Sequence, residues 1–246
     1  MRINKVFWLP VFHFADSLPF PLYICRNSYY NHRGLKQKTI YLIRHGETDY
    51  NRQGIVQGSG VDSDLNAMGQ TQALAFHQAY QHIPFAKVYT SKLRRTMQSV
   101  RFFIDAGIPY ESYEGLNEIS WGAREGKTPN SFDNEYYRTL IENWAAGHTD
   151  YPTEDGESPE QVARRQKPVI DLILSRPDEN PVLVCMHGRA IRILLAWLMN
   201  ESLSTMDLYE HSNLCLYKLN YAYDTNEFTI EVSNDSTHLL ALVVHQ

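Results

Sequence analysis

From residue 38 onward, apolar and polar positions follow two alternating patterns. Short runs rich in β-branched and aromatic residues predict strands, and longer stretches with an apolar residue every three or four positions predict helices. The predicted strands are residues 39–43, 86–90, 110–114, 181–186, 213–219 and 228–232. The predicted helices are residues 66–83, 93–106, 158–175 and 190–199, with another near 132–144. This alternation predicts an α/β fold, a three-layer α/β/α sandwich with a mostly parallel central sheet.

Local signals support several of these boundaries. Ser158 is followed by Pro159 and, three positions after the serine, by Gln161, a capping-box pattern that predicts a helix start. Polar residues 224–226 separate the last two strands, which predicts a closing antiparallel pair. Between residues 116 and 156 the periodicity weakens and aromatic and acidic residues accumulate. We expect this segment to be an insertion across the top of the sheet, where specificity usually resides.

Composition limits the possible classes of protein. The chain has 246 residues, of which 43% are hydrophobic and 21% charged, enough for one large α/β domain at residues 38–246. Its formal net charge of −5 gives no reason to expect nucleic acid or a membrane as partner. The cysteines, Cys25, Cys185 and Cys215, show no C-x-x-C spacing. Their pattern predicts neither a zinc site nor a disulfide framework and favours a cytoplasmic location.

Residues 1–37 differ in pattern from the rest of the chain. Basic residues precede an apolar run that superficially resembles a signal peptide, but Pro10, His13 and Asp16 interrupt that run. The run is also too short and broken to span a bilayer. We expect a poorly ordered extension or a start site assigned too far upstream. The alternatives are an export or anchoring segment and an ordered addition to the fold.

Two predicted strands end in a histidine followed by a glycine. The strand at 39–43 leads into Arg44 and His45, and the strand at 181–186 leads into His187. In open α/β sheets, ligands bind beyond the carboxyl ends of the strands. We therefore expect the two histidines to lie at one crevice.

Charged residues follow two other strands of the same predicted sheet. The second strand leads into a helix that begins near Arg94 and Arg95, and Glu118 lies after the third strand. One arginine of that pair, with Arg44 and His187, would form a pocket suited to an oxyanion such as phosphate. Taken singly, each of these residues is more often a structural or solvated group. The prediction therefore depends on their joint occurrence.

The main motifs are RHGET at 44–48, SKLRRTMQS at 91–99, LNEISWG at 116–122 and MHGRAIR at 186–192. GSGVDSDLNAMGQTQA at 58–73 and GES at 156–158 lie between them. In order and spacing, this set resembles the histidine phosphatase superfamily, the phosphoglycerate-mutase-like proteins. The resemblance extends over roughly residues 39–240. RHG alone would be a weak signal, whereas the ordered set is highly specific.

This resemblance implies phosphomonoester hydrolysis through a covalent phosphohistidine intermediate. His45 would be the nucleophile and Glu118 the proton donor, which requires a carboxyl group that partial burial keeps protonated near neutral pH. The family pattern Ser-x-Leu-x-Arg selects Arg95 rather than Arg94. The implied phosphate-binding residues are Arg44, Arg95, His187 and Asn51. A looser alignment implies substrate contacts at Gln57, Gly58 and Gly188.

The chain departs from the mutase pattern at three places. Cofactor-dependent mutases of the family carry Phe-Thr-Gly, Leu-Asn-Glu-Arg and Trp-Arg-Arg-Gly. The comparable positions here are VQG at 56–58, LNEI at 116–119 and WAAG at 144–147. Because the arginine clamp for a substrate carboxylate is missing, the resemblance implies a phosphatase of the histidine acid type rather than a phosphoglycerate mutase. The expected substrate is a small phosphorylated metabolite, with no cofactor and no metal.

Two further functional classes are compatible with the same residues. A metalloenzyme could use His45, His187 and Glu118 as ligands, although arginines around the same point would repel a cation. A catalytically inactive module that binds a phosphorylated ligand would keep the same anion-binding side chains. The sequence identifies neither the physiological substrate nor the oligomeric state.

Overall fold

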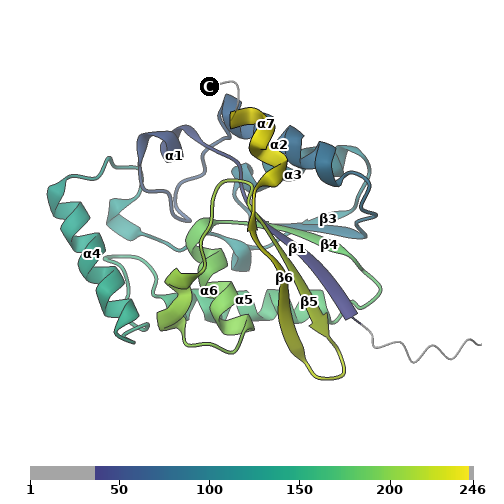
Figure 1. Cartoon of the computed structure of the whole chain (residues 1–246). Coiled ribbons are helices and arrows are strands. Elements are labelled where there is room, and N and C mark those ends of the chain that lie inside the picture. Colours follow the sequence, from purple (N-terminus) through teal and green to yellow (C-terminus); the bar gives the residue numbers. More distant parts are fainter. Residues whose placement is uncertain (1–36, 244–246) are drawn as a thin grey trace, which may run out of the picture. The chain divides into compact units, whose positions relative to one another are not determined.

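A computed structural model describes residues 37–243, so the extension expected at residues 1–37 lies outside them except for its last residue. A six-stranded sheet forms the centre of this part of the chain (Figure 1). The strands are β1 (Gln37–Arg44), β2 (Lys87–Thr90), β3 (Tyr110–Ser112), β4 (Val182–Met186), β5 (Leu216–Ala222) and β6 (Glu227–Asp235). The α-helices are α1 (Asp49–Gln53), α2 (Ala67–Tyr80), α3 (Arg94–Asp105), α4 (Ser131–Ala145), α5 (Pro159–Leu174), α6 (Gly188–Leu198) and α7 (Leu240–Val243). Short 3-10 helices are η1 (Glu114–Leu116), η2 (Gly122–Arg124), η3 (Leu203–Leu208) and η4 (Thr237–Leu239).

The strand order is β3-β2-β4-β1-β5-β6. Strands β1 to β4 pair in parallel, whereas β5 pairs antiparallel with both β1 and β6. The structure therefore confirms the mostly parallel sheet and its closing antiparallel pair. Because β4 lies between β2 and β1, the carboxyl ends of these three strands are neighbours. Open α/β sheets bind ligands at such a place.

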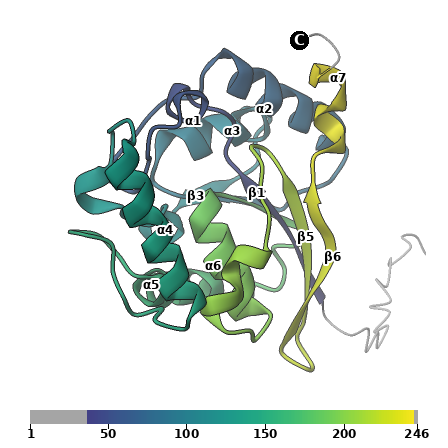
Figure 2. The same cartoon turned by 60° about the vertical axis from the view of Figure 1, so that its left-hand side comes forward.

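Side-chain alternation along β1 explains why helices cover both faces of the sheet. Ile40 and Leu42 pack with residues of α5 and α6, whereas Tyr41 and Ile43 pack with residues of α2 and α3. Strand β4 is buried along its whole length, as its continuous apolar run predicts. The result is the three-layer α/β/α sandwich, whose layers can be followed in Figure 2.

Helix α4 lies in the predicted insertion and packs on the outer side of α6 (Figure 2). Its Leu140 and Trp144 are fully buried in one cluster with Ile193 and Ala196 of α6. The Trp144 indole N–H also donates a hydrogen bond to the carbonyl of Tyr151 at 2.8 Å. The tetrapeptide at 144–147 is therefore the end of a packed helix.

Several elements differ from the sequence pattern, among them α1, β3 and β5. Helix α1 was not predicted, because five residues are too few to show helical periodicity; Thr48 caps it in a capping box with Asn51. Strand β3 ends at Ser112, because a 3-10 turn follows at η1. Strand β5 begins three residues later than predicted, after Leu214, whose φ of 54° takes it out of the strand conformation.

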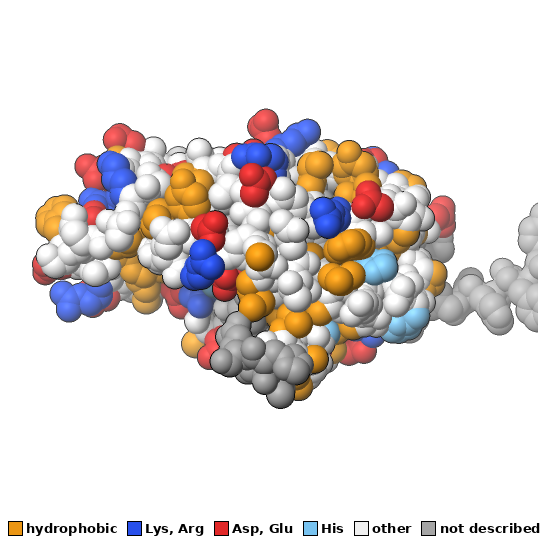
Figure 3. Space-filling model, turned by 90° about the horizontal axis from the view of Figure 1, so that it is seen from above, with side chains coloured by type: hydrophobic (Ala, Val, Ile, Leu, Met, Phe, Trp, Pro, Cys, Tyr) orange, Lys and Arg blue, Asp and Glu red, His pale blue; other side chains and the backbone are white. Residues whose placement is uncertain are grey.

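Other expectations concern membranes, charge and cysteines. In residues 37–243, no helix has both the length and the apolar character needed to cross a bilayer. Acidic and basic side chains lie close together on the face shown in Figure 3. Cys185 and Cys215 are free thiols in the core, and Cys25 lies outside the described residues.

Candidate active site

The residues after β1 form a tight corner that places the buried His45 at the carboxyl end of the sheet. Gly46 permits this corner, because a Cβ there would lie 2.7 Å from the carbonyl oxygen of Gly69 at the start of α2. The His45 backbone N–H donates to the carbonyl of Met186 at 3.0 Å. This bond ties the corner after β1 to the end of β4.

The tautomer of His45 follows from its backbone contact. Its Nδ1 lies 2.7 Å from the carbonyl oxygen of Gly46, which can only accept, so Nδ1 carries the proton and Nε2 keeps a free lone pair. Burial, reinforced by the charges of Arg95 and Arg44, holds the pKa of His45 well below its ordinary value. A neutral imidazole with a free Nε2 lone pair is the form that a nucleophile requires.

His187 follows β4 and lies beside His45. The two ring centroids are 5.1 Å apart. His187 Nε2 lies 2.8 Å from Ser91 Oγ, after β2, and its Nδ1 accepts from Arg95 Nε at 3.2 Å. Burial, and then the charge of Arg95, also holds the pKa of His187 well below its ordinary value. Residues from the ends of β1, β2 and β4 therefore meet at one point.

The two adjacent arginines at the start of α3 point in different directions. Arg95 is fully buried, and its Nη2 donates to the carbonyl of Gly58 at 3.2 Å. Arg94 is exposed and pairs with Asp62 and Asp64, each at 3.1 Å. Successive helical residues differ by roughly 100° in direction, so only one of the pair can face the histidines. The structure places Arg95 there.

Arg44 and Arg95 lie in this site without a carboxylate partner. Among residues 37–243, neither forms an ion pair. The Arg44 Nε is buried without a hydrogen-bond partner in that same range. Burial lowers the pKa of both groups, that of Arg95 to about 10. Guanidinium groups nevertheless keep their proton in proteins. Two desolvated cations without a counter-ion favour a bound anion.

Asn51 and Gln57 reach the same corner from α1 and the loop after it. The Asn51 Oδ1 accepts from the backbone and hydroxyl of Thr48 and from Asn213 Nδ2, so its NH₂ group remains for a ligand. Gln57 Nε2 donates to Thr48 Oγ1 at 2.8 Å. Both predicted contact residues therefore lie close to the His45 corner.

The two predicted glycine contacts are sites of close packing. A Cβ on Gly58 would lie 2.0 Å from Glu125 Oε1, and one on Gly188 would lie 2.7 Å from the ring of His211. Both glycines thus make room for a neighbouring side chain. Their contact with a substrate stays a prediction.

Glu118 is buried at the amino end of α6. Its Oε1 accepts from the backbone N–H of Ala190 at 2.8 Å and of Ile119 at 3.0 Å, and its Oε2 accepts from that of Arg189 at 3.1 Å. These backbone donors fix the position of the carboxyl group at the helix end. The expected protonation of Glu118 near neutral pH stays a prediction.

Arg165 of α5 supports the loop that contains Glu118. Its guanidinium donates to the carbonyls of Asn117 and Glu118 at 3.0 and 2.9 Å, and its Nε pairs with Glu157 at 2.8 Å. The GES motif at 156–158 therefore holds this loop in place. Sequence reasoning missed this role because most of the partners are backbone carbonyls.

His211 and Asn213 were also missed, because they lie in no motif. Asn213 Nδ2 donates to the carbonyl of His45 at 3.0 Å, and His211 Nδ1 lies 3.2 Å from Arg44 Nη1. Burial, and then the charge of Arg44, lowers the pKa of His211 to about 3. Their one available signal was their position just before a strand that pairs with β1.

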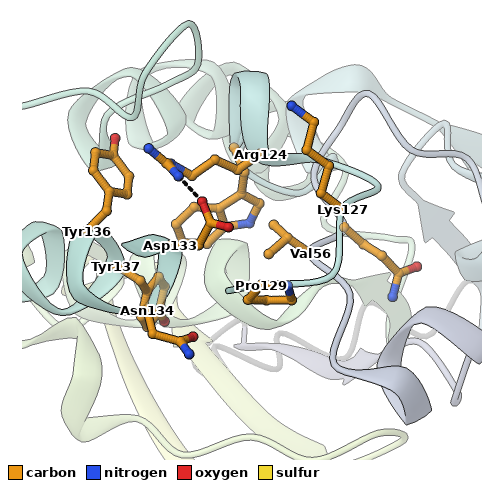
Figure 4. Close-up of a pocket in the computed structure, with 10 residues that line it drawn as sticks. Val56, Arg124, Lys127, Pro129, Asp133, Asn134, Tyr136 and Tyr137 are labelled. Atoms are coloured by element: carbon orange, nitrogen blue, oxygen red, sulfur yellow. Dashed lines mark hydrogen bonds and ion pairs between the residues drawn. The ribbon is translucent and has the colours of Figure 1, made fainter. Parts of the chain in front are cut away.

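A cavity of about 310 Å³ opens beside this site (Figure 4). It is lined by Val56, Gln57, Trp121, Arg124, Lys127, Pro129, Asp133, Asn134, Tyr136 and Tyr137. Gln57 belongs both to this lining and, through Thr48, to the His45 corner. The predicted insertion, which includes α4, thus forms most of the walls of the cavity.

The arrangement of charges suits an anion better than a cation. In the part of the chain that the structure describes, no three His, Cys, Asp or Glu side chains are grouped as metal ligands. The charges that act most strongly on His45 are the guanidinium groups of Arg95 and Arg44. Such charges attract phosphate and repel metal ions.

A sequence profile of the histidine phosphatase superfamily (branch 1) matches residues 40–236. Rat 6-phosphofructo-2-kinase/fructose-2,6-bisphosphatase 3 is 33% identical over 214 residues, which cover 83% of this chain and 36% of the rat protein. Mouse 6-phosphofructo-2-kinase/fructose-2,6-bisphosphatase 1 is 33% identical over 209 residues, with 82% and 42% covered. The chain spans less than half the length of these relatives.

Several solved structures share the fold, among them that of a phosphatase. A mycobacterial glucosyl-3-phosphoglycerate phosphatase in complex with VO3 has a TM-score of 0.71 at 26% identity, covering 80% of this chain and 99% of that one. YhfR of Bacillus stearothermophilus has a TM-score of 0.71 at 25% identity, covering 82% and 99%. These likenesses agree with the three-layer sandwich.

The opposite orientations of the two arginines lead to a first prediction. Arg95→Ala should lower kcat/KM for an aryl phosphate by about 10²- to 10³-fold, because a preorganised donor to the phosphate is lost. Arg94→Ala should change kcat/KM by less than about twofold, because its exposed ion pairs contribute little. Steady-state phosphate release measures both, with thermal unfolding as a check on folding. Comparable losses in the two variants would show that the wrong arginine was chosen.

The low pKa of His211 predicts a pH dependence of stability. Between pH 6.5 and about 3 the unfolded chain binds a proton at His211 that the folded chain does not, so stability falls as the pH falls. The slope from this group is about 1.4 kcal/mol per pH unit. His211→Asn should reduce the slope of unfolding free energy against pH by about that amount in urea titrations. The exposed His82→Asn is the control, and equal slopes in the two variants would contradict the prediction.

Proposed function

The chain belongs to the histidine phosphatase superfamily, and on this basis we propose that it hydrolyses phosphate monoesters through a covalent phosphohistidine on His45. The main support is the pairing of a neutral imidazole with two buried guanidinium groups that lack carboxylate partners. Such a site attracts a phosphate dianion and aims a nucleophile at its phosphorus. The proposal includes a small phosphorylated metabolite as substrate, classification as a histidine acid-type phosphoric monoester hydrolase, and a cytoplasmic location.

In the first step, His45 Nε2 attacks phosphorus in line with the ester oxygen. The N–P bond forms, the P–O bond breaks, and the electron pair leaves with the ester oxygen, which takes a proton from Glu118. The hydrogen bond from His45 Nδ1–H to Gly46 keeps the ring oriented while it gains positive charge. The nonbridging oxygens would contact Arg44, Arg95 and Asn51. His187 would join them by exchanging its Nε2 contact with Ser91 for a phosphate oxygen.

In the second step, Glu118 acts as a base. It takes a proton from water while the water oxygen attacks phosphorus and the N–P bond breaks, which releases inorganic phosphate and neutral His45. The three backbone N–H groups around Glu118 hold the carboxyl group in place for this transfer. Arg165 holds the same carboxylate in position through the loop.

A mutase has less support, because it would need a free cation for the carboxylate of its substrate. Arg124 already pairs with Asp133 and Glu154, and Arg189 pairs with Asp207. The alanines at 145 and 146 cannot replace them. A substrate without such a clamp would leave after the first step, and water would then discharge the phosphohistidine.

The covalent intermediate provides the direct test of this proposal. After mixing with an aryl phosphate and rapid denaturation at alkaline pH, mass spectrometry should locate a phosphate on His45. His45→Ala should release no phosphate and form no adduct, whereas the exposed His148→Ala should behave as the wild type. A phosphate panel run beside a mutase coupled assay should show release to water without transfer to a second hydroxyl. Turnover by His45→Ala, or transfer without release, would refute the proposal.

The acid role of Glu118 makes a separate prediction. Glu118→Gln should lower kcat for an alkyl phosphate by about 10²- to 10⁴-fold, because an alkoxide leaves only when it is protonated. For an aryl phosphate with a good leaving group, the rate of the phosphoenzyme burst should fall much less. Glu114→Gln, an exposed site four residues earlier, is the matched control. Equal losses for the two esters would argue against proton donation by Glu118.

A further inference from the structure

The cavity beside the His45 corner has walls that are mainly apolar. The rings of Trp121 and Tyr137 have centroids 5.6 Å apart. Val56 and Pro129 add further apolar side chains to the lining (Figure 4). Trp121 rests in turn on the buried Trp144, with centroids 6.1 Å apart. A volume of about 310 Å³ lies at the lower end of the range of about 300–1,000 Å³ for small-molecule pockets. It suits one or two rings rather than a protein segment.

The charged residues of the cavity are already neutralised or lie at its edge. Figure 4 shows the ion pair of Arg124 with Asp133. Arg124 also pairs with Glu154 at 2.9 Å, and its Cζ lies 3.8 Å above the ring of Tyr136. Lys127 is exposed, so solvent and salt screen its charge. The cavity thus offers little attraction to a second phosphate.

Hydrogen bonds connect the cavity to both sides of the reaction site. Gln57 reaches Thr48, which caps the helix containing Asn51. On the other side, the Tyr137 hydroxyl accepts from Arg189 Nη2 at 2.9 Å, and the Arg189 backbone N–H donates to Glu118. Because Glu118 would protonate the departing oxygen, a leaving group that extends past it would enter the cavity.

We propose that the cavity binds the leaving group of the ester and that this group is apolar and contains a ring, with no second phosphate. The proposal rests on the phosphatase function proposed above and names the substrate class of the same site. Apolar walls favour a ring through burial and through offset or edge contacts with Trp121 and Tyr137. A sugar bisphosphate would place its second phosphate in this cavity, where the lining offers no unpaired arginine to bind it.

Two esters with similar leaving atoms test this inference without a difference in intrinsic reactivity. Ethyl phosphate and 2-phenylethyl phosphate both release a primary alkoxide, and only the second can place a ring in the cavity. We expect kcat/KM to be at least about tenfold higher for 2-phenylethyl phosphate. Tyr137→Ala should reduce that ratio by about five- to tenfold, and Tyr137→Phe should retain most of it, because the ring rather than the hydroxyl makes the contact.

A matched control and two opposing outcomes complete the test. Tyr110→Ala removes an aromatic side chain from β3 that is 45% exposed, as Tyr137 is, and should leave the ratio unchanged. Equal kcat/KM for the two esters, or a higher value for fructose 2,6-bisphosphate, would overturn the inference while the phosphatase function stands. No phosphate release from any ester, with no phosphohistidine, would overturn both.

Discussion

The site depends on one electrostatic constraint: two guanidinium groups are held out of water, and neither forms an ion pair within residues 37–243. Removing Arg44 and Arg95 from solvent costs free energy that ion pairing usually offsets, and here the described residues offer no such pair. The fold tolerates this arrangement because β1 is packed on both of its faces and α3 is packed on one of them by apolar residues. A dianionic ligand restores the missing charge balance, so binding energy arises where the reaction occurs.

The same cations also set the state of the histidines. In water, an imidazole near neutral pH is partly protonated, and a protonated ring cannot attack phosphorus. Burial beside Arg95 and Arg44 favours the neutral form of His45 and His187. Glu118 is held instead by three backbone N–H groups, one in its own loop and two at the start of α6. The nucleophile and the acid–base group thus have different immediate hydrogen-bond partners within one crevice.

Sequence reasoning placed the parts of this site that depend on strand order and helix direction. The apolar runs before His45 and His187 predicted buried strands, and the rule for open sheets brought their ends together. The sequence did not predict contacts to backbone atoms. Arg165 donates to backbone carbonyls, and Asn213 donates to the carbonyl of His45. Because every residue has a backbone carbonyl, such contacts produce no recognisable motif. The cavity was equally hidden, because its walls depend on how α4 packs, and the sequence predicted only that α4 exists.

The packing of α4 on α6 determines which residues around the cavity can be substituted without loss of the fold. Leu140 and Trp144 fix the buried side of the helix, while its other side presents Tyr136 and Tyr137 to the cavity. The nucleophile and its arginines belong to the sheet and α3, and hydrogen bonds of Gln57 and Tyr137 connect the two regions. Substitutions of cavity residues outside these hydrogen bonds should then affect function nearly independently of substitutions at the nucleophile. Substitutions along one face of α4 could thus adapt the cavity to new leaving groups, while the residues that transfer the phosphoryl group stay unchanged.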